Sequence, residues 1–240
     1  WYSDLPDDVE VRFLTFPPND PEYANWWTIK DVAFLQIEKK RTIEEYPEYI
    51  KKLKTTLREN IDSYKPDVIH CQHLNFGFSR AIAELKLSIP TIGICHGTDV
   101  QMASTSDFFL HNMQIIRKQM HVLVFPAQKM ADDYFTIDPC DKKYVIIPHG
   151  IPDSAYKTRE TDFSTSQLRL LYAGRLNSYK GADIAIEAMK FLKEKDVHLT
   201  VIGKSDEVGF DTKLQEFVRE NGLENHVTFG EQLPRIKLFE

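Results

Sequence analysis

The chain has 240 residues, which is long enough for two modest domains that each have a hydrophobic core. Apolar residues make up 42% and charged residues 28% of the chain, the ordinary composition of a water-soluble globular protein. The formal net charge of -6 provides no strong field that would attract nucleic acid or an anionic membrane, so no nucleic-acid partner is expected.

The three cysteines, at positions 71, 95 and 140, are an odd number without the spacing of a disulfide framework, which favours reduced thiols in a cytoplasmic protein. No stretch approaches the ~18 uninterrupted apolar residues of a membrane span, and no signal peptide opens the chain. The first residues, Trp1 to Pro6, contain no initiator methionine and lead straight into a predicted strand. We therefore expect an earlier element to be missing.

Hydrophobic patterning in the first part of the chain predicts strands that alternate with helices. Residues 9–16 favour a strand, whereas the aromatic stretch that follows, to residue 40, has no clear pattern. A helix is predicted from Thr42 to Tyr64, with Pro47 near its start because an interior proline would kink it. The pattern then predicts, in chain order, a strand at 67–71, a helix at 79–87, a strand at 90–95, a helix at 106–120, a strand at 121–125, a helix at 127–135 and a strand at 144–147.

A polar stretch, residues 157–167, has the composition of an interdomain linker. After it the pattern predicts a strand at 168–173, a helix at 182–193, a strand at 197–202, a helix at 212–220 and a strand at 227–229. Strands that alternate with helices imply an α/β protein with right-handed crossovers and parallel sheets covered on both faces. We predict two Rossmann-like domains, residues 1–155 and 156–240, the second incomplete because the chain ends inside its expected next helix.

The segment with the strongest chemical signal runs from Ala173 to Gly181, between the end of a predicted strand and the start of a helix. Ligands bind at this place in parallel sheets. Gly174 lets the backbone turn without obstruction, and the first N–H groups of the helix would face an anion. Arg175 offers a planar fork suited to phosphate and Lys180 a compact charge, so the pair suits a diphosphate. The alternative is a surface loop whose two cations are simply solvated.

This segment resembles the motif of the retaining glycosyltransferases of the GT-B fold (glycosyl transferases group 1 / family 4), a large family that includes bacterial mannosyl- and glucosyltransferases. Members carry Gly-Arg-Leu/Ile-x3-Lys-Gly after the first strand of the C-terminal domain, and here the motif is Gly174-Arg175-Leu176 followed by Lys180-Gly181. The resemblance spans roughly residues 67–230 and includes, in order and at sensible spacing, the segments DVIH at 67–70, HGTD at 96–99, VIIPHGI at 145–151 and LTVIG at 199–203.

The resemblance implies roles for individual residues in catalysis and in binding the phosphates. Gly174, Arg175 and Lys180 would hold the donor diphosphate. His96, at the end of an N-terminal strand, would contact the transferred sugar and help to stabilise positive charge at its anomeric carbon. Asp99, the second residue expected in the catalytic set, would orient either His96 or the acceptor.

The resemblance also implies residues on the acceptor and nucleotide sides. His73 would lie where acceptor-side residues gather. Gly203 and the turn at 230–233 would flank the nucleotide, with Leu233 as a contact to the base. Relatives carry a glycine-rich loop after their first strand, and two glutamates eight positions apart near the end of the donor site, and neither feature is found here. We therefore expect an incomplete site that binds nucleotide weakly at best and transfers no sugar.

The sequence also contains residues that suggest a metal site and a membrane contact. The histidines and cysteines near positions 70 and 95 suggest zinc, but His70 and Cys71 point to opposite faces of a strand and no pair has Cys-x2-Cys spacing. No metal site is therefore predicted. Aromatic and basic residues between Tyr23 and Arg41 suggest either peripheral contact with a membrane that carries a lipid-linked acceptor or, in preference, a packed lid or part of the acceptor pocket.

The sequence thus predicts a metal-independent hexosyltransferase that moves a sugar from a nucleoside-diphosphate sugar to a hydroxyl of a glycan, glycolipid or small molecule, with retention at the anomeric carbon. No cofactor is expected beyond the donor substrate, and the location is expected to be the cytoplasm or the inner face of the membrane. Two alternatives stay open: a non-catalytic module that binds nucleotide sugar, and a nucleotide-sugar epimerase of the same fold. The sequence specifies no oligomeric state.

Overall fold

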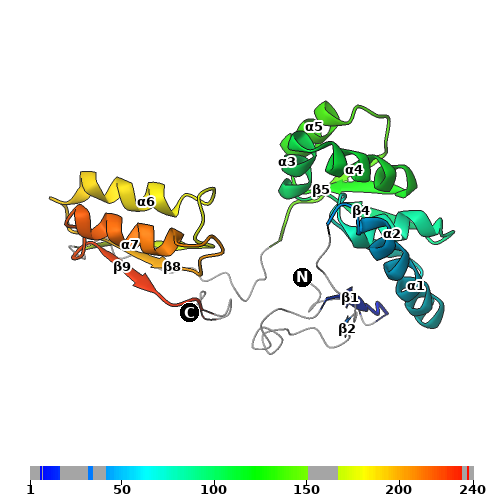
Figure 1. Ribbon diagram of the computed structural model, residues 1–240, viewed down its shortest axis with the longest axis horizontal. Coiled ribbons are helices and arrows are strands. Elements are labelled where there is room, and N and C mark those ends of the chain that lie inside the picture. Colours follow the sequence, from blue (N-terminus) through cyan, green and yellow to red (C-terminus); the bar gives the residue numbers. More distant parts are fainter. Residues whose placement is uncertain are drawn as a thin grey trace. The chain divides into compact units, whose positions relative to one another are not determined.

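A computed structural model describes residues 6, 8–16, 42–150, 167–233 and 237, together with the backbone of residues 32–34. Contacts between residues divide the chain into two compact units, unit 1 at Trp1–Pro152 and unit 2 at Asp153–Glu240 (Figure 1). Each unit is built on parallel β-sheet, so the predicted α/β class is confirmed. None of the helices in the described part of the chain has both the length and the apolar character that crossing a bilayer requires.

Unit 1 contains a two-stranded sheet and a four-stranded sheet. The smaller sheet pairs β1 (Phe13–Thr15) with β2 (Val32–Phe34). The larger sheet has the order β3-β4-β5-β6, with its strands at Ile69–Gln72, Thr91–Ile94, Val122–Phe125 and Tyr144–Ile146. The helices of unit 1 are α1 (Tyr46–Tyr64), α2 (Gly77–Leu85), α3 (Gly97–Thr105), α4 (Asp107–Gln119) and α5 (Gln128–Ile137).

Helix α1 begins at Tyr46, four residues later than the sequence predicts. The delay has a local cause, because the backbone N–H of Thr42 donates to the Glu45 carboxylate at 2.8 Å and the Glu45 N–H donates to the Thr42 hydroxyl at 3.4 Å. These reciprocal bonds stabilise a turn before the helix. Pro47 then occupies the first turn of α1, as predicted.

The helices of unit 1 pack against one another. α1 packs against α2, α2 against α4, and α3 against both α4 and α5. The strand order explains this arrangement, because a parallel sheet that advances in one direction by right-handed crossovers places its connecting helices on the same face. The central strand β5 is nevertheless buried on both sides, with Leu123 and Phe125 on one face and Val124 on the other.

Unit 2 has a three-stranded sheet in the order β7-β8-β9, with strands at Leu168–Ala173, Val197–Ile202 and Val227–Gly230. Its helices are α6 (Ala182–Ala188), which continues as the 3₁₀ helix η3 (Met189–Leu192), and α7 (Phe210–Glu220). Figure 1 shows α6 and α7 over the same face of this sheet.

Burial in unit 2 alternates along its strands. In β8, Val197, Leu199 and Val201 are buried, and the residues between them are half-buried. In β7, Leu168 and Leu171 are more than half exposed. The expectation that both faces of each sheet are covered is therefore wrong for the described part of unit 2, because successive crossovers in one direction put both helices on one face.

Candidate functional site

The parallel register of unit 1 brings two predicted site residues together. Gln72 at the end of β3 pairs with Ile94 at the end of β4, so the residues that follow these strands meet at one edge of the sheet. The ring centroids of His73 and His96 lie 4.2 Å apart, with an angle of 32° between the ring planes. The ring of His149 follows at 6.3 Å from that of His96. We call His73, His96 and His149 the histidine cluster.

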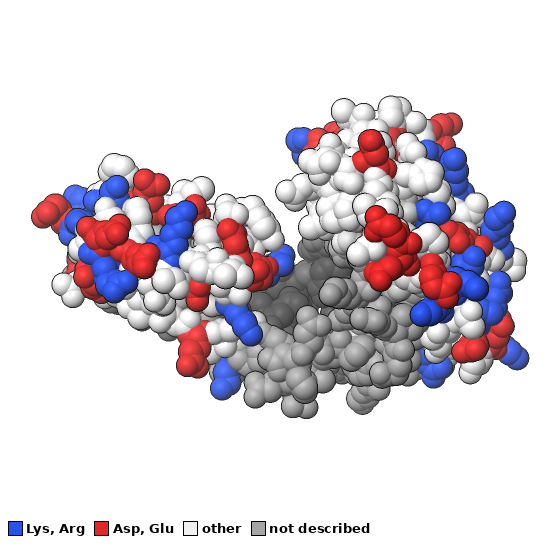
Figure 2. All heavy atoms as spheres, in the orientation of Figure 1, with Lys and Arg blue, Asp and Glu red and all other residues white. Residues whose placement is uncertain are grey.

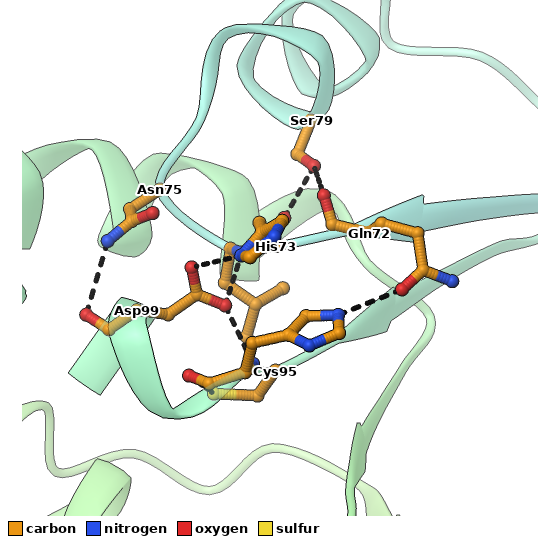
Figure 3. A network of polar contacts seen from close by, with 8 residues as sticks. Gln72, His73, Asn75, Ser79, Cys95 and Asp99 are labelled. Carbon is orange, nitrogen blue, oxygen red and sulfur yellow. Dashed lines mark hydrogen bonds and ion pairs between the residues drawn. The ribbon is translucent and has the colours of Figure 1, made fainter. Parts of the chain in front are cut away.

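Asp99 contacts two members of this cluster, His73 and His96 (Figure 3). Its carboxylate is fully buried at 0% exposure and lies 3.0 Å from Nδ1 of His73. It also accepts hydrogen bonds from the backbone N–H groups of Leu74 at 3.1 Å and His96 at 2.8 Å. A carboxylate without exposed surface acts through the groups that it holds, and Asp99 holds both the ring of His73 and the backbone of His96.

The protonation state of His96 follows from its surroundings. Burial and, next, the neighbouring His73 ring lower the pKa of His96, while the Asp99 carboxylate acts in the opposite direction. His96 is therefore neutral near pH 7. Its Nε2 lies 2.9 Å from Oε1 of Gln72, an amide oxygen that only accepts, so Nε2 carries the proton and Nδ1 is left as an acceptor.

Sequence reasoning missed several residues that shape this edge of the sheet. Gln72 fixes the tautomer of His96, and the Asn75 side chain donates to the Asp99 backbone carbonyl at 3.2 Å. The Ser79 hydroxyl contacts the carbonyl of His73, whose backbone is left-handed with φ of 72°. The only available signal was their position in the chain, because Gln72 ends β3, Asn75 lies in the segment just after it and Ser79 lies in the first turn of α2.

In unit 2, the loop Gly174–Gly181 lies directly beside the loop that follows β8. A β-carbon added to Gly203 would lie 1.9 Å from the carbonyl oxygen of Gly174, so only glycine allows this approach. The Gly174 N–H donates to the Ile202 carbonyl at 3.0 Å, and the Leu176 N–H donates to the Lys204 carbonyl at 3.0 Å. The predicted residues Gly174 and Gly203 are thus in direct backbone contact.

Carboxylates from the second loop contact donors of the first. One guanidinium nitrogen of Arg175 lies 2.9 Å from the Asp206 carboxylate, whose other oxygen accepts from Asn177 at 2.8 Å. Hydrogen bonds from Asn177 and then the charge of Arg175 lower the pKa of Asp206. The Ser178 N–H donates to the Glu207 carboxylate at 3.0 Å. Of the residues that the sequence assigns to phosphate, Arg175 therefore lies against a carboxylate, that of Asp206.

Lys180 and Gly181 complete the loop. Lys180 is exposed, and Gly181 has φ of 78°, a left-handed conformation that favours glycine. Helix α6 starts at the next residue but spans only seven residues before it tightens into η3. The two cations and the backbone of the loop, rather than a long helix, are therefore what this part of unit 2 offers to an anion.

A hollow of about 290 Å³ lies next to the two loops of unit 2. It is lined by Gly203, by Phe229 and Gly230 at the end of β9 and by Glu231 just after it, together with Leu176. The predicted nucleotide-flanking segments therefore line one hollow. Leu233, predicted as a contact to the base, is half-buried beyond the turn and is not among the lining residues.

Neither a basic surface on the face in view nor a metal-binding group among the described residues is found. On the face shown in Figure 2, acidic and basic side chains intermingle over both units, so this face offers no continuous basic surface for nucleic acid. The described residues contain no group of three or more His, Cys, Asp or Glu side chains that could hold a metal ion. The aromatic and basic residues between Tyr23 and Arg41, expected to form a packed lid or part of the acceptor pocket or else to contact a membrane, lie outside the described side chains.

Comparisons with known proteins address both units. The family model described as Glycosyltransferase Family 4 matches residues 5–155, and the model described as Glycosyl transferases group 1 matches residues 155–239. A search of curated protein sequences finds no match.

Solved structures show the same fold at low sequence identity. Sucrose-phosphate synthase from Thermosynechococcus elongatus matches with a TM-score of 0.74 and 17% identity, over 94% of this chain and 61% of that one. Anabaena Alr3699/HepE in complex with UDP-glucose matches with a TM-score of 0.65 and 16% identity, over 85% of this chain and 56% of that one. A glycosyltransferase from Rickettsia africae ESF-5 matches with a TM-score of 0.59 and 17% identity, over 86% and 56%. The chain thus spans less than two thirds of each of these proteins.

Proposed function

The chain belongs to the GT-B glycosyltransferases of family 4 and group 1, and on that premise we propose that it serves a retaining transfer of a hexose from a nucleoside-diphosphate sugar to a hydroxyl acceptor. The observation that carries the proposal is the loop Gly174–Gly181, which presents Arg175 and Lys180 at the carboxyl end of β7. Its backbone is fixed by bonds to the strand and loop beside it.

Electrostatics supports the diphosphate as the ligand of this loop. A departing nucleoside diphosphate gains negative charge, and the two cations of the loop would stabilise that charge. Arg175 has five N–H donors, so contact with Asp206 at one nitrogen leaves others for phosphate. We propose that these cations replace a metal ion and that no further cofactor takes part.

For the transferred sugar we propose His96 as the contacting residue. The neutral ring carries no positive charge to repel the positive charge that develops at the anomeric carbon of the sugar. Asp99 then acts as a positioning residue through His73 and the backbone of His96. His73 itself is proposed on the acceptor side.

For the nucleotide we propose the hollow beside Gly203 and Gly230. The similarity to the Anabaena protein, whose solved structures hold UDP and UDP-glucose, makes UDP the first nucleotide to test. In this proposal the acceptor proton passes to the departing phosphate oxygen, so the chain contributes position and charge rather than a strong base.

Calorimetric titration of the chain with UDP tests the phosphate role. Arg175→Ala and Lys180→Ala are each expected to weaken UDP binding by about tenfold or more, because each removes a charge-assisted contact worth about 1.5–3 kcal/mol. Lys213→Ala, at an exposed lysine of α7, is the matched control and is expected to bind UDP as the unaltered chain does. Unchanged UDP affinity in both loop variants contradicts the proposal.

A further inference from the structure

The side chain of Tyr172, a residue of β7, contacts the backbone of the Gly174–Gly181 loop near both of its ends. It is the next-to-last residue of β7, and its ring packs against the core of unit 2. Its hydroxyl oxygen lies 3.1 Å from the backbone carbonyl of Arg175 and 3.3 Å from that of Lys180. The hydroxyl therefore joins the two residues that carry the cations of the loop.

The chemistry of this contact is that of a donor shared by two acceptors. A hydroxyl has one proton, so Tyr172 shares it between the two carbonyls or alternates between them. Burial and then the charge of Asp183 raise the pKa of Tyr172, so the hydroxyl remains protonated and able to donate. The ring, held by the core, makes the anchor rigid.

The contact restricts where the two cations can lie. Arg175 and Lys180 are five residues apart in the chain, and a loop of that length closes in many ways unless its ends are joined. The Leu176 N–H bond to Lys204 fixes the first half of the loop. The N–H groups of Ser178 and Lys180 donate to Glu207 and to the Asn177 carbonyl, respectively. Tyr172 connects the second half to the first, because it bonds at Arg175 and Lys180 alike.

Gly174 leaves space for the Tyr172 hydroxyl because it has no side chain. A β-carbon at Gly174 would lie 3.3 Å from the Tyr172 oxygen, which is closer than ordinary contact. A larger residue there would press directly on the atom that bonds the loop. The glycine of the motif thus has a second physical reason besides backbone freedom.

We propose that Tyr172 is a positioning residue for the diphosphate: its hydroxyl sets the spacing of Arg175 and Lys180 so that both meet the same ligand. This inference rests on the proposed diphosphate role of the loop. A preorganised loop binds more tightly because less order is lost on binding.

The test uses Tyr172→Phe in the full chain, which removes the hydroxyl and keeps the ring. Calorimetry with UDP and with inorganic pyrophosphate is expected to show about fivefold to tenfold weaker binding of both, the effect of one hydrogen bond. Uridine, which carries no phosphate, is expected to bind as it does to the unaltered chain, an outcome that a general loss of structure would not produce. Tyr179→Phe, at a 63% exposed tyrosine of the same loop, is the matched control and should change none of these affinities by more than about twofold.

Gly174→Ala provides a second route to the same contact, since its methyl group displaces the hydroxyl, and it should weaken UDP and pyrophosphate binding in the same way. If Tyr172→Phe binds UDP within about twofold of the unaltered chain while Arg175→Ala loses binding, the inference is wrong and the proposed function stands. Equal weakening of UDP and uridine also overturns the inference. If Arg175→Ala and Lys180→Ala bind UDP normally, or the unaltered chain binds none, the proposed function itself fails.

Discussion

Gly203→Ala tests the close approach on which the shape of the unit 2 loops depends. The added methyl carbon would lie 1.9 Å from the Gly174 oxygen, about 1.5 Å short of the 3.4 Å at which ordinary contact begins. The obstructing atom is backbone, so no side chain can rotate away. Overpacking of this kind costs about 3 kcal/mol, and the reduced freedom of the unfolded chain offsets up to about 1 kcal/mol of it. We expect a net loss of about 2 kcal/mol in the stability of unit 2.

Amide hydrogen exchange measures this loss where it arises. The N–H groups of Gly174 and Leu176 are bonded across the two loops, and a loss of about 2 kcal/mol accelerates their exchange about thirtyfold. Gly230→Ala is a matched control in the same sheet, because its methyl would come nearest to the flexible Ile202 side chain, at 3.3 Å, and would stay 4.0 Å from the backbone oxygen of Val201. Exchange in Gly203→Ala within about threefold of the unaltered chain would refute the argument from close approach.

Four further outcomes are expected. Asp99→Asn should lower the pKa of His96 further, because the Asp99 carboxylate raises that pKa in the unaltered chain. NMR titration of the imidazole measures the change, and a higher pKa of His96 in the variant would contradict the contact between Asp99 and this region. Burial lowers the pKa of both His70 and His96, so below about pH 6.5 the unfolded chain binds protons more readily than the folded chain. Unit 1 should therefore lose stability as the pH falls from about 6.5 towards 5. A urea midpoint that stays constant over that range would contradict this expectation. Cys140 is half-buried and should react with a thiol reagent before the buried Cys71, because burial raises the pKa of Cys71 to about 12. Mass spectrometry identifies the site that is modified first, and modification of Cys71 before Cys140 would contradict this expectation. UDP binding should be unchanged by EDTA, and loss that manganese or magnesium restores would indicate a bound metal.

Local patterns were enough to predict the strands whose ends carry Gly174 and Gly203. The bounds of β7 and β8 agree with the sequence-based ranges because strong apolar runs end at Gly174 and Gly203. Helix α3 was missed. Its residues are mostly polar and only Asp99 and Ala103 are buried, so it has no apolar stripe for a pattern to detect.

The contacts that organise each site were not predictable from spacing. Gln72 reaches His96, and Asp206 reaches Arg175, across neighbouring parallel strands, so their roles depend on register and loop geometry. Tyr172 appeared only as an apolar residue in a strand, although its hydroxyl lies at the centre of the loop. Motif residues are visible in a sequence, whereas the residues that position them become visible in the fold.

The measurement that tests the central claim most directly is an amide NMR titration of the chain with UDP. The largest shifts are expected at Gly174 and Gly181 in the loop and at Gly203 and Gly230 beside the hollow, and Arg175→Ala should abolish those in the loop. Shifts confined to unit 1, or loop shifts that persist in Arg175→Ala, would contradict the claim that this loop binds the donor diphosphate.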